Sequence, residues 1–351
     1  MKSYQLVAFG AVLEPSETAT PQPVGTEILL RTRAAGVCHS DLHLCEGGYD
    51  LGGGRVLSLT DRGVRLPRTL GHETVGEVVA IGPDATGVAV GDMRLIYPWI
   101  GCGECANCRA GSENLCLGMP ANLGVHRDGG YADHIMVRDP RYLLDLKGLD
   151  PVTAAPYACS GVTTYSAIRK LGDVVRDKPI LLIGAGGLGL MCLSLLSALG
   201  GKGAVVVDLD PVKRDAALKA GALAAVDGAA PDAAAQISAA LGRPLRAAID
   251  FVGNPATAAL GFDLLAKGGK MVVVGLFGGA SPWSLPLFPM KALTVQGSYV
   301  GNLQDLHELI DLVSGLPQTP LPIDARPLDQ ANRTLDDLAN GRVVGRAVLI
   351  P

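Results

Sequence analysis

The clearest hydrophobic pattern in the chain lies between residues 179 and 210. Ile180 to Ile183 is a short run of Ile and Leu, typical of a strand that is buried on both faces. Glycines follow at once, and Leu188 to Leu199 then continues as an apolar segment of helical length. Gly203 to Val207 is a second apolar run, and Asp208 comes directly after it. This order predicts a strand, a glycine-rich turn, a helix and a second strand, which together form a βαβ unit.

The same alternation of apolar runs and helical segments continues to residue 297. We expect buried strands at Ala224–Val226, Ala247–Val252, Lys270–Val274 and Leu293–Gln296. We expect helices between them at Pro211–Ala220, Asp232–Leu241 and Pro255–Ala266. Strands that alternate with helices in this way predict a doubly wound parallel sheet, the Rossmann class of α/β fold.

In the remainder of the chain, apolar residues recur about every second position, as in strands with one buried face. Residues 1–35 alternate between apolar and polar, the alternation returns at 131–145, and a strand rich in Val and Gly is expected at 74–81. This pattern predicts a mainly antiparallel β-domain. Residues 46–68 are rich in glycine and mixed in polarity, so we expect a surface loop there. Further helical segments are expected at Pro151–Leu171, Leu303–Ser314 and Leu328–Asn340, with a final strand at Gly345–Ile350.

Composition is that of a well-packed globular protein. The chain has 351 residues, of which 48% are hydrophobic and 18% charged, and its formal net charge is -4. It has no basic cluster, so we expect neither nucleic acid nor an anionic membrane as a partner. The uncharged run from 179 to 201 could suggest a membrane span, but its glycines and flanking proline favour the βαβ unit. The N-terminus lacks an apolar signal core, which predicts a cytoplasmic protein.

The glycine-rich turn has the chemistry needed to hold a dinucleotide. Gly184 allows a tight turn, Gly186 lets backbone N–H groups approach a pyrophosphate, and Gly189 lets the helix pack close to the strand. Asp208 can accept hydrogen bonds from the adenosine ribose and repel a 2′-phosphate, which predicts NAD rather than NADP. We therefore expect the dinucleotide turn to consist of Gly184, Gly186, Gly187, Leu188 and Gly189.

The most specific metal signal lies in residues 102–116. Cys102, Cys105, Cys108 and Cys116 are spaced C-x₂-C-x₂-C-x₇-C, with glycine and polar residues between them. Four thiolates at this spacing form a closed tetrahedral site, which suits a structural zinc ion because no position stays open. An iron–sulfur cluster is the alternative, since C-x₂-C-x₂-C also opens ferredoxin motifs. The wide last gap and the lack of a second cysteine set favour zinc.

A second candidate metal site is spread over three segments. Cys38 opens a dense reactive set that runs to His43, although alone this set could equally be a helix start capped by Ser40. His72 precedes a strand and could be a structural histidine, whereas Cys159 precedes a helix just before the βαβ unit. Two cysteines and a histidine on three elements are a ligand set of catalytic zinc, where a fourth position stays open.

Together these motifs resemble those of the zinc-containing alcohol dehydrogenases of the medium-chain dehydrogenase/reductase superfamily, and the resemblance covers essentially the whole chain. It is carried by Cys38-His-Ser-Asp-Leu-His, Gly71-His-Glu, the four-cysteine segment, Ala158-Cys-Ser-Gly and Gly184-x-Gly-Gly-x-Gly. The resemblance implies a GroES-like catalytic domain from 1–159 and 298–351, with a structural zinc lobe at about 100–118, and a Rossmann NAD-binding domain at 160–297. It also implies NAD-dependent interconversion of an alcohol with an aldehyde or ketone, and two zinc ions per subunit, one catalytic and one structural.

The residues of the family's zinc centre and proton relay carry over one by one. By resemblance, Cys38, His72 and Cys159 are the ligands of the catalytic zinc ion. Ser40 matches the hydroxyl that hydrogen-bonds the substrate oxygen, and His43 matches the end of the proton relay.

Residues around this centre match supporting groups of the family. Glu73 resembles a glutamate that takes the fourth zinc position transiently, and Asp41 resembles the carboxylate that orients the ligand histidine. His39 stands where a basic residue lies near the pyrophosphate, and Lys213 matches a lysine near the adenosine ribose. Arg346 resembles an arginine that contacts phosphate.

The substrate and the assembly are less determined. We expect the nicotinamide beside Val274, Gly275, Leu276 and Ser298. Tyr97 and Trp99 are candidates for the substrate pocket, with packing in the core equally open for both. The spacing between Cys38 and His72 is longer than the resemblance implies, and the excess at 49–68 could border the substrate channel.

Other interpretations stay open at the level of sequence. A polyol, a cyclic alcohol or a thioester-linked compound could be the substrate, and a non-catalytic NAD- and zinc-binding protein is a more distant alternative. By analogy we expect a homo-oligomer, with a tetramer favoured over a dimer. No role is predicted for Cys45 or Cys192.

Overall fold

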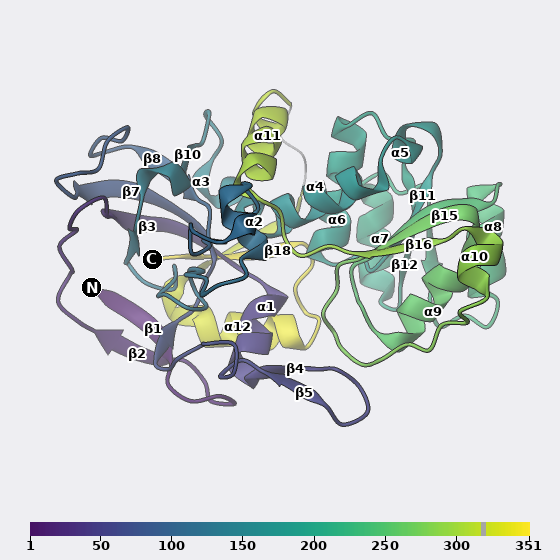
Figure 1. Cartoon of the computed structure of the whole chain (residues 1–351), viewed down its shortest axis with the longest axis horizontal. Helices are drawn as coiled ribbons and strands as arrows, with labels where there is room; N and C mark the ends of the chain where they lie inside the picture. Colours follow the sequence, from purple (N-terminus) through teal and green to yellow (C-terminus); the bar gives the residue numbers. More distant parts are fainter. Residues whose placement is uncertain (317–320) are drawn as a thin grey trace.

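The computed structural model describes residues 1–316 and 321–351, and it consists of two lobes joined side by side (Figure 1). One lobe contains the N-terminal strands together with the C-terminus, and the other contains the nucleotide-binding pattern found in the sequence. The predicted combination of a Rossmann sheet with a mainly antiparallel β-domain is confirmed.

The second lobe is built on one six-stranded parallel sheet with the order β13-β12-β11-β14-β15-β16. Alternate side chains of its central strand enter two separate cores: Leu181 and Ile183 enter one, and Ile180 and Leu182 the other. This explains the continuous apolar run, because both faces of the strand are covered by helices. The strands are β11 (Ile180–Ile183), β12 (Ala204–Asp208), β13 (Ala224–Asp227), β14 (Leu245–Asp250), β15 (Leu265–Val273) and β16 (Thr294–Gly297).

Helices of this lobe begin at clear local signals. Asp210 accepts a hydrogen bond from the Val212 N–H at the start of α7, and proline occupies the first turn. Asn254 and Thr257 form a capping box at the start of α9. The helices are α5 (Val174–Asp177), α6 (Gly187–Ala198), α7 (Pro211–Lys219), α8 (Ala233–Leu241), α9 (Pro255–Leu264) and α10 (Leu287–Lys291).

In the first lobe, the C-terminal strands complete a sheet begun by the N-terminal strands. The sheet has the order β10-β8-β7-β3-β18-β17, and β9 also pairs with β3. Strand β18 is antiparallel to β3, so Ala347 lies opposite Val37 just before Cys38. The strands are β3 (Ile28–Val37), β7 (Glu73–Ile81), β8 (Met93–Ile96), β9 (His134–Val137), β10 (Leu143–Asp145), β17 (Ile323–Pro327) and β18 (Arg346–Ile350). A smaller sheet contains β1 (Lys2–Leu6), β2 (Glu14–Glu17) and β6 (Arg68–Thr69).

Short helices surround this sheet, and α4 connects it to the parallel sheet. Helix α4 packs against both α6 and α11, and one apolar core extends from β3 and β7 through α4 to β11. The helices are α1 (His39–Glu46), α2 (Ala106–Arg109), α3 (Pro151–Ala154), α4 (Ser160–Leu171), α11 (Leu303–Ser314) and α12 (Ala331–Ala339). Short 3₁₀ turns are η1 (Glu113–Leu115), η2 (Pro140–Tyr142), η3 (Ala155–Ala158) and η4 (Leu328–Gln330).

Three sequence predictions differ from the structure. The surface loop expected at residues 46–68 contains regular structure, because β4 (Gly48–Asp50) and β5 (Val56–Ser58) pair there as an antiparallel hairpin. The helix expected at Pro255–Ala266 ends at Leu264, since the next residues join β15. The helical segment at Pro151–Leu171 is interrupted by η3, where Pro156 prevents regular α-helical hydrogen bonding. Among the described residues, no helix is long and apolar enough to cross a membrane.

Candidate active site and metal centres

The first candidate metal ligand, Cys38, lies where β3 ends and α1 begins. Cys38, and not Ser40, is the N-cap of α1, and its N–H donates to Asp41 Oδ2 at 3.0 Å. The Asp41 carboxylate is completely buried and also accepts a hydrogen bond from the Tyr131 hydroxyl, at 2.9 Å. A buried charge needs such donors, and here they hold the start of α1 in one position.

The same carboxylate orients His72, which lies directly before β7. His72 Nδ1 is 3.3 Å from Asp41 Oδ1, and the imidazole is buried. Both ring nitrogens, Nδ1 and Nε2, are buried without a hydrogen bond among the described residues. A buried imidazole that lies beside a carboxylate and has an unpartnered nitrogen suits a metal-binding histidine.

Cys159 completes a three-ligand group from the turn before α4. The ligand atoms of Cys38, His72 and Cys159 all lie within 4.8 Å of one another, and all three residues are buried. A hydrogen bond from the Cys159 thiol is the largest influence that lowers the pKa of Cys38. Two sulfurs and one imidazole nitrogen suit zinc, and the three residues leave a fourth position available.

Glu73 and Arg346 form a buried ion pair next to this group. Arg346 Nη2 donates to Glu73 Oε2, and Glu73 Oε1 accepts from the Ser160 N–H at 3.1 Å. Burial raises the pKa of Glu73 to about 7 despite the opposing effect of the guanidinium. A side chain at Gly36 would meet Glu73 Oε2 at 2.1 Å, so only glycine fits there. Both oxygens of Glu73 are therefore held by protein donors.

Ser40 and His43 lie on α1 between the three-ligand group and the surface. Ser40 Oγ is 3.8 Å from Cys38 Sγ and its residue is half-buried. His43 Nδ1 is 3.1 Å from Glu46 Oε2, and 17% of the His43 side chain is exposed. The two side chains thus span the distance from the buried sulfur to solvent.

The two aromatic pocket candidates lie in different environments. Tyr97 is fully buried and its hydroxyl donates to the Gly301 carbonyl at 2.9 Å, which fits the packing interpretation. Trp99 lies 5.3 Å from the His72 ring and 6.0 Å from the Tyr299 ring, measured between ring centroids. The indole N–H of Trp99 donates to the Ala158 carbonyl, next to Cys159. Trp99 therefore borders the ligand group.

The glycine-rich turn leads from β11 into α6 as the sequence predicts. Gly184 has φ +100°, and a Cβ at Gly189 would lie 2.0 Å from the Gly184 carbonyl oxygen, so both positions require glycine. A Cβ at Gly186 would meet no protein atom within 4 Å, which leaves open space where a phosphate must approach. Asp208 Oδ2 accepts from the Ala185 N–H at 2.7 Å and so lies beside the turn. Leu188 follows at the start of α6.

Several cationic groups gather near the start of α6. The side chain of Arg346 reaches it, because a Cβ at Gly187 would lie 2.6 Å from Arg346 Cδ. Desolvation lowers the pKa of His39, and the positive charges of Arg346, His43 and Lys213 lower it further. Sequence reasoning missed Arg214, whose Nη1 donates to the Asp208 carbonyl at 2.9 Å. These charges suit a ligand that carries phosphates.

The segment expected to hold the nicotinamide lies at the carboxyl end of the parallel sheet. Val274 N–H and Gly275 N–H both donate to the backbone carbonyl of Asp250, at 2.8 and 3.1 Å. Val274 is buried, and the next residue but one, Leu276, is 44% exposed. The hydroxyl of Ser298 is buried without a protein partner among the described residues. It is free to bond a ligand.

Sequence reasoning also missed Thr163. It lies on α4, one turn after Cys159, and its N–H donates to the Cys159 carbonyl at 2.9 Å. Its Oγ1 is buried and finds no partner in the described part of the chain. The i, i+4 spacing from a candidate metal ligand on a predicted helix is the signal that could have identified it.

The four-cysteine lobe forms the second candidate metal centre. The sulfurs of Cys102, Cys105, Cys108 and Cys116 lie within 4.8 Å of one another. Backbone N–H groups point at these sulfurs, for example Leu117 N–H at 3.4 Å from Cys105 Sγ, and they lower the pKa of Cys105 to about 6. Such N–H···S contacts favour thiolates, the form that binds zinc.

Glu113 attaches this lobe to the β-sheet. Its buried carboxylate accepts hydrogen bonds from the Gly101 N–H at 3.0 Å and the Tyr142 hydroxyl at 2.8 Å.

The remaining two cysteines lie outside both groups of candidate metal ligands. Cys192 is buried in α6, and burial raises the pKa of Cys45 to about 12. All eight thiols are free of disulfides.

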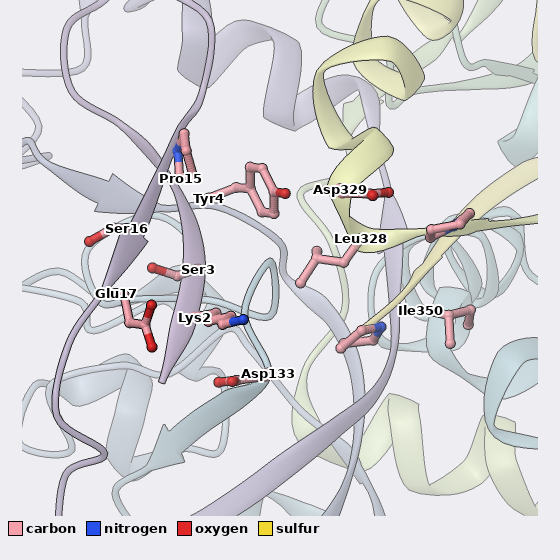
Figure 2. Close-up of a pocket in the computed structure, with 12 residues that line it drawn as sticks. Lys2, Ser3, Tyr4, Pro15, Ser16, Glu17, Asp133, Leu328, Asp329 and Ile350 are labelled. Carbon is pink, nitrogen blue, oxygen red and sulfur yellow. The ribbon is translucent and has the colours of Figure 1, made fainter.

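A separate groove of about 690 Å³ lies on the first lobe between β1, β2 and the C-terminal strand (Figure 2). Its lining combines charged residues such as Lys2, Glu17, Asp133 and Asp329 with apolar ones such as Leu328 and Ile350. None of the candidate site residues lines this groove, so it is a feature apart from the two metal centres.

Comparison with known proteins agrees with this geometry. Residues 25–147 match the model of the alcohol dehydrogenase GroES-like domain, and residues 187–315 match that of the zinc-binding dehydrogenases. The chain is 37% identical to an NAD-dependent alcohol dehydrogenase of Sulfurisphaera tokodaii, over 100% of both chains. It is 32% identical to a D-arabinose 1-dehydrogenase (NADP(+)) of Saccharolobus solfataricus, over 100% of this chain and 97% of the other. The crystal structure of an alcohol dehydrogenase from Aeropyrum pernix matches with a TM-score of 0.88 and 31% identity, over 100% of both chains.

Replacing Cys105 by Ser should lower the zinc content and the melting temperature, by more than about 5 °C, because a bound structural metal stabilises only the folded chain. Metal analysis and thermal unfolding measure the two effects. Cys45→Ser is the matched control, since that thiol lies outside both groups. Full zinc content and an unchanged melting temperature in Cys105→Ser would contradict a metal at this lobe.

Proposed function

The chain belongs to the zinc-containing alcohol dehydrogenase family, and from this premise we propose how its own residues carry out NAD-dependent alcohol oxidation and the reverse reduction. One observation carries the proposal: Cys38, His72 and Cys159 meet in a buried group beside the hydroxyl of Ser40. A closed structural site would need a fourth protein ligand, whereas an open position serves a substrate oxygen.

We assign Cys38, His72 and Cys159 to a catalytic zinc ion and the four-cysteine lobe to a structural one, two per subunit. When bound, zinc supplies a Lewis acid that lowers the pKa of the alcohol hydroxyl, and NAD accepts the hydride. Asp41 keeps the His72 ring in the orientation that exposes Nε2. Glu73 holds Arg346 in place, and a transient contact of Glu73 with the metal requires this ion pair to open first.

The proton released from the alcohol leaves along α1. Ser40 Oγ, next to the sulfur of Cys38, accepts this proton, and a bound cofactor would supply ribose hydroxyls for the continuation of the path. His43 lies at the partly exposed end of the path and exchanges the proton with water. Hydroxyl and imidazole groups are suited to this transfer because each can both donate and accept a hydrogen bond.

The carboxyl edge of the parallel sheet offers the residues that would hold NAD. Gly186 and the start of α6 would receive the pyrophosphate, with His39 and Arg346 supplying positive charge. Val274, Gly275, Leu276 and Ser298 would border the nicotinamide. Asp208, which lies beside the glycine-rich turn, and Lys213 would face the adenosine ribose. Since the relatives include proteins named for NAD and for NADP(+), we assign the preference for NAD to the negative charge of Asp208, which would repel a 2′-phosphate.

Replacing Asp208 by Ala should weaken the binding of NAD, because a charged hydrogen bond is lost, and should remove a repulsion of the 2′-phosphate of NADP. The ratio of kcat/KM for NADP to kcat/KM for NAD should therefore rise by about tenfold or more. Steady-state kinetics with both coenzymes measure the ratio. Asp208→Asn keeps one acceptor oxygen for the turn and should shift the ratio in the same direction. Asp215→Asn, which removes an exposed charge on α7, is the charge control. An unaltered ratio in both Asp208 variants refutes the role of Asp208.

Replacing Ser40 by Ala should reduce kcat by about 10²-fold or more while leaving the zinc content unchanged, because only the proton path is interrupted. Ser40→Thr keeps the hydroxyl and should retain most of the turnover. Alcohol oxidation at saturating NAD, together with metal analysis, gives both readouts. Turnover of Ser40→Ala equal to that of the wild type removes Ser40 from the path.

A polyol is the second candidate substrate. It is favoured by the full-length similarity to a protein named D-arabinose 1-dehydrogenase. Cyclic alcohols and thioester-linked compounds have no such support. A panel of primary, secondary, cyclic, aromatic and sugar alcohols with NAD separates these classes.

We also propose a cytoplasmic location, which the two clusters of free thiols support because they need a reducing compartment.

We further propose that the chain forms a homo-oligomer, with a tetramer favoured by the family resemblance. Strand β16 is an unpaired edge of the parallel sheet (Figure 1), and the apolar side chains of Phe277, Leu285 and Met290 nearby are at least 70% exposed. An exposed edge next to apolar side chains favours association with a second copy.

Replacing Leu285 by Glu should therefore lower the mass of the assembly in solution, because a charge would be buried at the contact. Light scattering coupled to size-exclusion chromatography measures this mass. Val90→Glu places the same charge on an exposed apolar residue of the other lobe and is the control. A mass of Leu285→Glu equal to that of the wild type refutes this contact.

A further inference from the structure

Trp99 contacts two of the three segments that carry the candidate catalytic ligands. Its side chain is buried, and its indole N–H donates to the carbonyl of Ala158 at 3.2 Å, directly before Cys159. Its ring also lies 5.3 Å from the ring of His72, measured between centroids. Because a buried carbonyl needs a donor, the indole N–H fixes the turn η3, which ends at Cys159.

The four-cysteine lobe begins three residues after Trp99, and the chain that leaves the lobe returns beside this residue. The Ala121 N–H donates to the Ile100 carbonyl at 2.8 Å. The Leu123 N–H donates to the Pro98 carbonyl at 3.0 Å. The backbone on both sides of Trp99 is therefore bonded to the segment that follows the lobe.

Asn114, in η1 of the lobe, reaches the segment that follows β16. Its side-chain amide donates to the Tyr299 carbonyl at 3.0 Å. The next residue, Val300, has φ +43°, a left-handed conformation that β-branched residues rarely adopt. Such a conformation persists only where the surrounding contacts hold it. Asn114 provides such a contact before Val300, and the bond from the Tyr97 hydroxyl to the Gly301 carbonyl provides one after it.

The ring of Tyr299 completes the connection to Trp99. The two rings meet edge to face, with centroids 6.0 Å apart and planes at 66°. Contacts of this kind contribute beyond the area that the rings bury, so they restrict the indole plane. The four-cysteine lobe thus reaches Trp99 by two routes, through the backbone at 98–100 and through Asn114 and Tyr299.

We propose that Trp99 and Asn114 are positioning residues of the three-ligand group, and that the four-cysteine lobe holds the geometry of this group through them. The indole N–H keeps Cys159 within reach of the other two ligands, and Asn114 keeps the Tyr299 ring against the indole. Neither Trp99 nor Asn114 is a candidate metal ligand, so both act through other residues. The inference rests on the proposed function, because that function assigns a zinc ion to the three-ligand group.

The test measures how fast dipicolinate removes zinc from the zinc-loaded, full-length protein. This rate reports on the geometry of each metal site without any substrate. The wild type should release its zinc in two phases. The phase that is missing from Cys38→Ala belongs to the three-ligand group, since that variant lacks one of its thiols.

Trp99→Phe keeps an aromatic ring beside His72 and Tyr299 but removes the N–H donor to Ala158. It should accelerate zinc release from the three-ligand group by about tenfold or more, because second partners of metal ligands have effects of this size. The release phase of the four-cysteine lobe should stay unchanged.

Asn114→Ala removes the donor to the Tyr299 carbonyl and should accelerate the same phase by about threefold or more. Asn114→Asp keeps the size of the side chain without the N–H donor and should act in the same direction. Adding Asn114→Ala to Trp99→Phe should change the rate little further, since Asn114 acts through the indole N–H that is already absent. Glu104→Ala shortens an exposed side chain of the same lobe and is the matched control.

A wild type with two phases, whose three-ligand phase is unchanged in the Trp99 and Asn114 variants, overturns this inference and leaves the proposed function standing. Equal acceleration of both phases with a lower melting temperature also overturns it, because the side chains would then only stabilise the fold. If Trp99→Phe does not fold, the two Asn114 variants decide. A folded wild type that binds zinc in the four-cysteine lobe alone overturns the proposed function, and this inference with it.

Discussion

The active site depends on one buried carboxylate. Asp41 is completely inaccessible, and removing a charge from water is costly unless donors replace the lost hydration. The donors here come from distant parts of the chain: the N–H of Cys38, the N–H of Gly71 and the hydroxyl of Tyr131, and the His72 ring lies 3.3 Å away. Satisfying this charge therefore brings the start of α1 and the start of β7 together. Two of the three candidate zinc ligands, Cys38 and His72, are thereby held close to each other, whereas Cys159 comes from the turn before α4.

A second buried charge pair couples this centre to the C-terminal strand. Arg346 opens β18, which pairs with β3, and its guanidinium bonds Glu73 directly after His72. Buried ion pairs add little net stability, but losing one partner is strongly destabilising. The pair thus acts mainly as a constraint on geometry. It places one cation between Glu73, the neighbour of the candidate ligand His72, and the glycine-rich turn at Gly187.

The two lobes differ in how they serve the reaction. The parallel sheet supplies a dinucleotide site from backbone geometry, because Gly184, Gly186 and Gly189 leave room for turns and phosphates. The antiparallel lobe supplies side chains with acid–base and metal chemistry on short segments between strands. The β4–β5 hairpin connects the two lobes, because Asp50 and Gly52 contact Gly279 and Ala280.

Local signals in the sequence were sufficient for the parallel-sheet lobe and for selecting candidate metal ligands, which the structure places in two groups with ligand atoms within 4.8 Å of one another. The run Ile180–Ile183, the glycine spacing and the proline and Asp210 at the start of α7 act through neighbouring residues, so they can be recognised without the fold. The hairpin in 46–68, the strand β17, the roles of Glu113 and Thr163 and the packing of Tyr97 could not be recognised in this way. Each depends on a partner that is distant in sequence, and the register that brings such partners together is set only when the whole chain packs. The sequence alone thus determined which chemistry is present, whereas the tertiary structure decided which of its groups meet.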